Sequence, residues 1–173
     1  MPEQKPKTIA EYIGHDDPNS PLFYLDEWTS DSPQCLLFSG QPGLGKTTAA
    51  YLIGQELELD IVELNASDER GIDAVRNKIK EIAYSSSLWS ARLILLDEFE
   101  GMTKPAQEAL KRMMEKSNCW WILTCNDLSS VIPAIKSRCV QFHFKPYSVK
   151  QIRAYLETLI SAHGVIATDS PEV

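Results

Sequence analysis

The chain has 173 residues, of which 43% are hydrophobic and 24% charged, and its formal net charge is −7 at pH 7. This length suits one hydrophobic core and argues against two full domains. The acidic balance supplies no overall basic field, so any contact with nucleic acid needs a local basic patch. Because no apolar run reaches membrane-span length and Met1–Lys5 does not resemble a signal peptide, the sequence predicts a soluble intracellular protein.

The first third of the chain predicts two short helices ahead of a buried strand. Residues 1–19 are polar, and only Thr8–Ile13 has helical character. Ser20 and Pro21 supply a cap and a first-turn proline for a second helix. The apolar run Cys35–Ser39 then predicts a short strand.

A glycine-rich loop follows this strand and fits the pattern G-x-x-x-x-G-K-[ST], whose backbone N–H groups wrap a polyphosphate. The residues expected to contact the nucleotide here are Gly40, Gln41, Pro42, Gly43, Leu44, Gly45, Lys46, Thr47 and Thr48. A helix predicted over 47–58 would aim its N-terminus at the phosphates. Lys46 would reach the β- and γ-phosphates, and the Thr47 hydroxyl would ligate Mg²⁺. A chance glycine-rich turn is the alternative, but the strand–loop–helix context favours nucleoside triphosphate binding.

Strands and helices alternate through the rest of the chain. The expected strands are Ile61–Leu64, the run Arg92–Glu98 that is closed by two acids, Trp120–Thr124 and Cys139–Phe144. The expected helices are 72–84, one capped by Thr103, part of 131–136, and one that opens at the capping box Ser148-x-x-Gln151 and runs to about 162. Alternation without an internal repeat predicts an α/β domain with a five-stranded parallel sheet.

Polar residues end the predicted strands on the edge where ligands bind in such folds. Asp97 is placed to hold Mg²⁺ together with Thr47, and Glu98 could polarise an attacking water. Asn126 could orient the same water or contact the γ-phosphate. The alternatives are a solvated strand end for the two acids and a plain turn for Asn126.

The four cysteines show no C-x-x-C spacing, and three lie in or beside apolar runs; they are Cys35, Cys119, Cys125 and Cys139. We interpret them as reduced core or near-core thiols, with a zinc site as the less favoured alternative.

Two basic features leave alternatives open. By position alone, Arg138 is favoured as surface charge, although an Arg supplied by a neighbouring subunit can accelerate phosphoryl transfer by about 10³–10⁵-fold. Arg76 and Lys80 lie four residues apart on one predicted helix, and Lys111-Arg112 adds two cations on a later one. The cluster could follow a phosphate backbone, but solvated helix faces balanced by glutamates fit equally well.

Together these motifs resemble the small subunits of sliding-clamp loaders of the replication factor C type, with phage clamp-loader ATPases as relatives. The resemblance covers roughly residues 5–166, and its matching segments are 5–8, 13–14, 64–71, 95–103, 107–115, 124–127 and 137–139. The pieces Asn-Ala-Ser-Asp-Glu-Arg-Gly at 65–71 and Ser-Arg-Cys at 137–139 are specific to that family among AAA+ ATPases.

The resemblance implies an AAA+ nucleotide-binding domain over residues 1–146 and the truncated start of a helical lid over 147–173. It implies an ATP hydrolase that uses ATP and Mg²⁺ and needs a neighbouring subunit. The implied partners are other clamp-loader subunits in a ring, the sliding clamp and primer–template DNA, with no membrane.

The resemblance also implies roles for individual residues. Ile13 and Gly14 would lie at the adenine, and Asn126 would be the first sensor of the γ-phosphate. Asn65 would restrain Glu98 until DNA or a partner engages.

Two further roles concern neighbouring molecules. Arg138 would be the finger that reaches a neighbour's ATP, which reverses the interpretation from position alone. Arg76, Lys80 and Arg112 would line a spiral around duplex DNA and contact its backbone.

The chain departs from the family pattern in three places. Lys5 and Phe99 stand where the family usually has Arg and Ala, and the chain ends before the second-sensor Arg of the lid and the collar. The main hypothesis is therefore an ATPase module of a clamp loader. The alternatives are a non-hydrolysing nucleotide-binding assembly subunit and another AAA+ DNA-remodelling ATPase.

Overall fold

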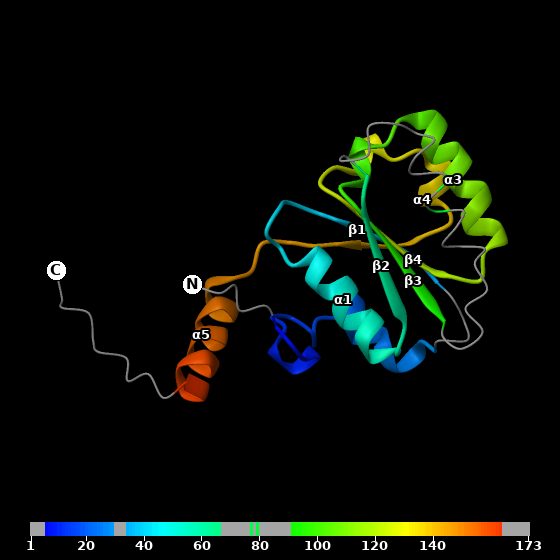
Figure 1. Ribbon diagram of the computed structural model, residues 1–173. Coiled ribbons are helices and arrows are strands. Elements are labelled where there is room, and N and C mark those ends of the chain that lie inside the picture. The colour runs from blue at the N-terminus through cyan, green and yellow to red at the C-terminus, as the bar shows by residue number, and fades with distance from the viewer. Residues whose placement is uncertain (1–5, 30–33, 67–76, 78, 80–90, 164–173) are drawn as a thin grey trace.

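A computed structural model describes residues 6–29, 34–66, 77, 79 and 91–163 (Figure 1). Five parallel strands form one sheet in the order β2-β3-β4-β1-β5, which confirms the predicted α/β fold. The strands are β1 (Cys35–Ser39), β2 (Asp60–Asn65), β3 (Arg92–Asp97), β4 (Trp120–Cys125) and β5 (Val140–His143).

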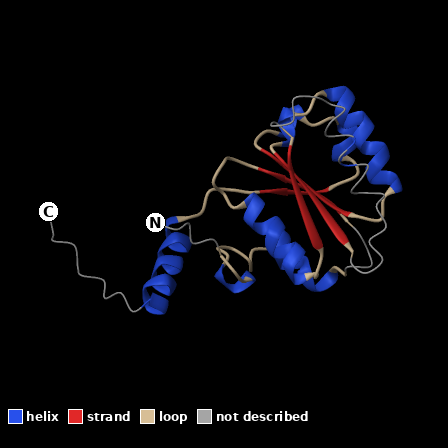
Figure 2. Cartoon of the chain, viewed as in Figure 1, coloured by secondary structure: helices blue, strands red, loops and turns tan. Residues whose placement is uncertain are grey.

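The central strands are buried on both faces, as expected for a parallel sheet covered by helices. Residues 93–96 of β3 and all six residues of β4 are buried. Alternate side chains of β1 enter two different cores: Leu37 packs with the α3 side, and Leu36 and Phe38 pack with the α1 side. Helices therefore cover both faces of the sheet (Figure 2).

The α-helices of the described residues are α1 (Lys46–Glu56), α3 (Lys104–Lys116), α4 (Pro133–Lys136) and α5 (Val149–His163). Short 3₁₀ helices are η1 (Ile9–Glu11), η2 (Pro21–Glu27), η3 (Phe99–Gly101) and η4 (Leu128–Ser130). The capping box before α5 is confirmed, because the Ser148 backbone N–H donates to Gln151 Oε1 at 2.9 Å and the Gln151 N–H donates to Ser148 Oγ at 3.3 Å. None of the described helices is long and apolar enough to cross a membrane.

Two predictions differ in the structure, and a third concerns residues that the structure does not describe. The helix expected over Thr8–Ile13 is reduced to the three residues of η1, because Tyr12 is extended and its buried side chain bonds the phosphate loop. Thr103 occupies the N-cap position of α3 but makes no side-chain cap bond. The helix expected over 72–84, with Arg76 and Lys80, falls outside the described residues except at positions 77 and 79.

Candidate nucleotide-binding site

The phosphate loop connects β1 to α1 and requires glycine at its first position. Gly40 has φ +140°, and a Cβ added there would lie 2.4 Å from the Phe144 backbone oxygen. Gly43 has φ +80°, but a Cβ there would meet nothing within 4 Å. Both backbones are strained for any other residue, and only Gly40 is also crowded by another strand end.

We expect Gly40→Ala to lower the free energy of unfolding by more than the about 1–3 kcal/mol of backbone strain, because the clash with Phe144 adds to that strain. Gly43→Ala is the matched control, since it carries the backbone strain without the clash. Thermal unfolding of the two variants measures the difference. Equal melting temperatures would show that the contact with Phe144 is not constraining.

Lys46 begins α1, and its side chain folds back so that the ammonium group contacts the phosphate loop. Its Nζ donates to the backbone oxygens of Gly40 at 2.7 Å and Gln41 at 2.9 Å, and to Asn126 Oδ1 at 3.2 Å. The residue is only 8% exposed, and burial lowers the pKa of Lys46 against the opposing pull of the Asp97 and Glu100 carboxylates. An incoming polyphosphate would exchange these neutral acceptors for charged ones.

Asp97 ends β3 and meets the first turn of α1. Thr47 Oγ1 donates to Asp97 Oδ2 at 3.2 Å, and Thr124 Oγ1 donates to the other carboxylate oxygen. The Glu98 backbone N–H donates to Asp97 Oδ1 at 3.2 Å. The structure thus brings Thr47 and Asp97 together, and carboxylate and hydroxyl oxygens are the ligand types that suit Mg²⁺.

Glu98 follows Asp97 in a left-handed conformation with φ 52° and ψ 45°. This region costs a non-glycine residue roughly 1–3 kcal/mol and is found at functional sites. Asn65, paired with Asp97 in the β2–β3 register, donates from Nδ2 to Glu98 Oε2 at 3.3 Å. The contact between Asn65 and Glu98 is therefore present.

Asn126 follows β4 and joins the same edge of the sheet. Its Oδ1 accepts from Lys46, while its backbone N–H donates to Glu100 Oε1 at 3.2 Å and its side-chain amide donates to the same oxygen. Glu100 lies in η3, directly after the turn that carries Glu98. The loop lysine and the polar ends of β3 and β4 thus form one connected group.

A cavity lies beside the loop, where the base of a nucleotide would be expected. It is lined by residues from the N-terminal segment, the loop and the start of α5, including Ile13, Gly14, Leu44, Phe144, Tyr147 and Gln151. The two residues expected at the adenine are therefore brought to the loop.

Two tyrosines hold the loop on this side. Tyr12 Oη donates to the backbone oxygens of Leu44 at 3.3 Å and Gly45 at 3.2 Å, and Tyr147 Oη donates to Leu44 at 3.0 Å. Burial raises the pKa of Tyr12 and that of Tyr147, which further favours the protonated, donating form of both phenols.

Four residues contribute to the site without having been predicted from the sequence: Tyr12, Glu100, Thr124 and Tyr147. Thr124 could have been predicted, because its hydroxyl lies near the end of an otherwise apolar strand. No local sequence pattern indicates the other three, whose contacts join segments far apart in the chain.

Arg138 lies away from this group. It precedes β5, and β5 runs parallel to β1, so Arg138 stands at the edge of the sheet opposite the phosphate loop. The five residues of β1 separate the two edges by roughly 15 Å at about 3.3 Å per residue. The Arg138 guanidinium forms an ion pair with Glu115 of α3. Because Arg138 lies at the edge opposite the phosphate loop, it cannot reach the nucleotide of its own chain from this position.

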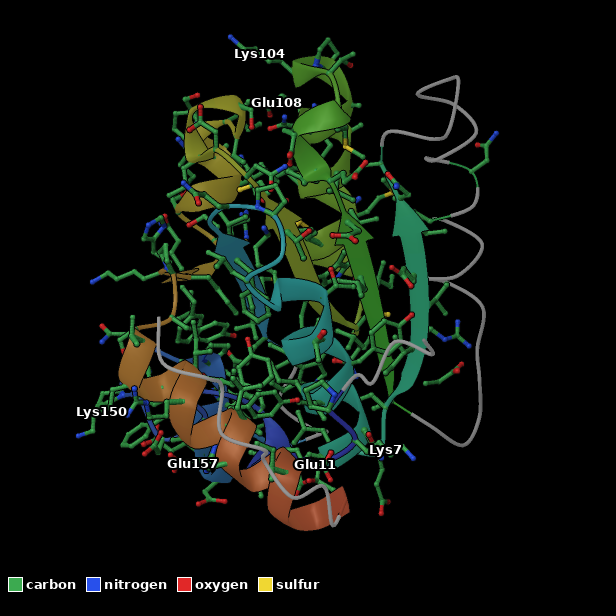
Figure 3. The ribbon with its side chains drawn as sticks, turned by 90° about the vertical axis from the view of Figure 1, so that its left-hand side faces the viewer. Lys7, Glu11, Lys104, Glu108, Lys150 and Glu157 are labelled. Carbon is green, nitrogen blue, oxygen red and sulfur yellow. The ribbon has the colours of Figure 1, made fainter. Side chains whose placement is uncertain are left out.

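The remaining predicted cations are either exposed or undescribed. Arg112 is exposed on α3, whereas Arg76 and Lys80 fall outside the described residues. Lys104, at the start of α3, points away from the domain (Figure 3). DNA contact by these residues stays a prediction.

The cysteines are all free, with Cys35 half-buried and the other three buried, which agrees with reduced thiols. Burial raises the pKa of Cys139 to about 12 and that of Cys125 to about 11, which disfavours the thiolate needed to bind metal. The described part of the chain holds no group of three His, Cys, Asp or Glu side chains that could ligate a metal.

A parallel sheet of this strand order, with a glycine-rich loop after β1 and polar residues at the ends of β3 and β4, defines a P-loop nucleotide-binding protein. The chain belongs to the AAA family, since the model described as "ATPase family associated with various cellular activities (AAA)" matches residues 36–147. Membership of this family implies that the chain binds a nucleotide.

Similar curated proteins are replication factor C small subunits of archaea. One from Methanococcus maripaludis is 42% identical over 157 residues, which cover 86% of this chain and 49% of the relative. One from Methanosarcina mazei is 46% identical over 78% of this chain and 43% of the relative, and one from Archaeoglobus fulgidus is 40% identical over 95% and 54%. The chain spans about half the length of the curated relatives it matches.

The fold is shared with solved structures of lower sequence identity. Thermotoga maritima RuvB, described as a Holliday junction branch migration motor, superposes with a TM-score of 0.71 at 19% identity. The match covers 93% of this chain and 55% of that chain. At this identity the likeness establishes a common fold alone.

Proposed function

We propose that the chain is the ATP-hydrolysing module of a clamp loader of the replication factor C type. The observation that carries the ATP-hydrolysing part of the proposal is the convergence of Lys46, Asp97 and Asn126 at one edge of the sheet. The clamp-loader part is supported by the 40–46% identity to replication factor C small subunits.

In this proposal the loop N–H groups and Lys46 bind the phosphates, and Ile13 and Gly14 contact the adenine. Thr47 and Asp97 would hold Mg²⁺, which supplies charge neutralisation for the β- and γ-phosphates. The fit rests on the hydrogen bond between the Thr47 hydroxyl and an Asp97 oxygen, which places two hard oxygen donors together.

Hydrolysis requires a positioned water in line with the γ-phosphate. Glu98 is proposed to accept a hydrogen bond from that water and to draw its proton as the water attacks phosphorus. Asn126 would orient the water or the phosphate. The bond from Asn65 to Glu98 would keep the carboxylate aside until a partner engages.

Residues 1–146 are proposed as the nucleotide-binding domain and 147–173 as the start of the lid. The support is that α5 begins at Val149 with its own capping box at Ser148, and that α5 exposes apolar side chains at Val149, Ile152 and Leu156. Tyr147 would connect the two units through its bond to the loop.

Arg138 is proposed to act on a neighbouring subunit's ATP. ATP turnover per molecule should rise with protein concentration, and Arg138→Ala should lower it by about 10³-fold or more, because the finger stabilises the transition-state charge. The measurement is turnover across a concentration series of the full chain.

Glu115→Ala is the matched control for this test, because it also breaks the ion pair but keeps the guanidinium. Its turnover should stay within severalfold of wild type. A rate independent of concentration, or an unaffected Arg138→Ala variant, would contradict action across an interface.

Addition of a sliding clamp and primed DNA tests the clamp-loader assignment itself. We expect both together to stimulate turnover. Stimulation by DNA alone, without response to a clamp, would instead favour another AAA+ DNA-remodelling ATPase.

A further inference from the structure

Glu100 holds the side chain of Asn126 from the side opposite Lys46. Glu100 Oε1 accepts the Asn126 backbone N–H at 3.2 Å and also accepts its side-chain amide. Asn126 Oδ1 in turn accepts from Lys46 Nζ at 3.2 Å. The Asn126 amide is thus bonded at its nitrogen and its oxygen by two different charged groups.

These two partners permit only one orientation of the amide. A carboxylate can only accept a hydrogen bond and an ammonium group can only donate one. Rotating the Asn126 amide by 180° would place its NH₂ against Lys46 and its oxygen against Glu100, and both contacts would be repulsive. Glu100 therefore selects which atom Asn126 presents at the phosphate loop.

Glu100 is also well placed to connect two strand ends. It lies in η3, which begins directly after Glu98, whereas Asn126 follows the neighbouring strand β4. The Asn126 bond therefore ties the β4 end to the turn that carries Glu98. The second Glu100 oxygen, Oε2, is buried with no hydrogen-bond partner among the described residues. Within the described part of the chain, the carboxylate therefore accepts hydrogen bonds through Oε1, from Asn126.

We infer that Glu100 is a positioning residue for nucleotide hydrolysis that acts through Asn126. The inference rests on the proposed ATPase function. It assigns a role to Glu100, a residue to which the sequence motifs assigned none. Removal of the Glu100 carboxylate leaves the Asn126 amide held by Lys46 alone and separates it from the Glu98 turn. Hydrolysis depends on this geometry more than ground-state binding does.

The expected result for Glu100→Ala is a turnover lowered by about 10- to 100-fold, the loss typical of one hydrogen bond to a charged group, at an ATP dissociation constant within about threefold of wild type. Glu100→Gln keeps an oxygen acceptor and the side-chain shape, so it should restore most of the turnover. Glu108→Ala, which removes an exposed carboxylate of α3, is the matched control and should behave as wild type.

Orientation of the amide is measured directly on the ¹⁵N-labelled full chain by NMR. The Asn126 side-chain NH₂ signals should shift in Glu100→Ala and stay near their wild-type positions in Glu100→Gln and Glu108→Ala. Asn126→Ala assigns the signals by their loss. This readout needs neither nucleotide nor turnover.

A double variant separates action through Asn126 from a general loss of structure. Glu100→Ala combined with Asn126→Ala should turn over no more slowly than Asn126→Ala alone, because the second change removes a group already without its target. Multiplied losses, or Asn126 signals unmoved in Glu100→Ala, would overturn the inference. If the wild-type chain hydrolyses no ATP, the proposed function fails, and the amide signals alone decide whether Glu100 orients Asn126.

Discussion

Lys46→Met is expected to raise the ATP dissociation constant by at least about 30-fold. The reason is that the Lys46 ammonium is buried at the centre of the loop, where it would meet the phosphate charge with little screening by water. Truncating one partner of a buried charged pair typically costs about 2–5 kcal/mol. Isothermal titration calorimetry with MgATP measures the change.

The methionine retains most of the aliphatic stem, so the expected loss reports the charge and its donors. The Lys46 ammonium donates to three neutral acceptors, two backbone oxygens and the amide oxygen of exposed Asn126. Because the substitution leaves no charged partner unpaired among these acceptors, we expect only a small change in thermal stability. Lys104→Met is the matched control, because that lysine is exposed at the start of α3. Unaltered ATP affinity in Lys46→Met would refute the assigned phosphate site.

Glu98→Gln is expected to lower ATP turnover by about 10²–10⁴-fold, the contribution of a general base, while ATP affinity stays within about threefold of wild type. The substituted amide keeps the shape of the side chain and can still interact with Asn65, but it cannot draw a proton from water. The position favours such a role, because Glu98 is exposed beside Asp97 and held in a left-handed conformation. Single-turnover hydrolysis with excess protein measures the chemical step.

Glu108→Gln serves as the control for this substitution, since Glu108 is an exposed glutamate that does not belong to the connected group of Lys46 and the polar ends of β3 and β4. If Glu98→Gln hydrolyses ATP at the wild-type rate, Glu98 is not the base, and a non-hydrolysing nucleotide-binding assembly subunit becomes the better description of the chain.

The elements that sequence analysis predicted well are those specified by local pattern. The strand β1, the loop and helix α1 are contiguous, and the apolar runs of β3 and β4 are long enough to identify as buried strands. Predicted and observed limits differ by a residue or two. For example, the helix predicted over 47–58 is α1, which spans Lys46–Glu56. The short helix expected over Thr8–Ile13 failed because a tertiary contact of Tyr12 outweighed a weak local preference.

By itself, the sequence determined the fold class, the phosphate loop and the acids at the end of β3, because each depends on residues close together in the chain. Only the tertiary structure decided the strand order and which polar groups meet. It placed Glu100 against Asn126, Tyr147 against the loop, and Arg138 at the opposite edge of the sheet. The first two of those contacts join segments 26 and 103 residues apart. Such contacts depend on how the strands pair, so no local periodicity of the sequence can predict them.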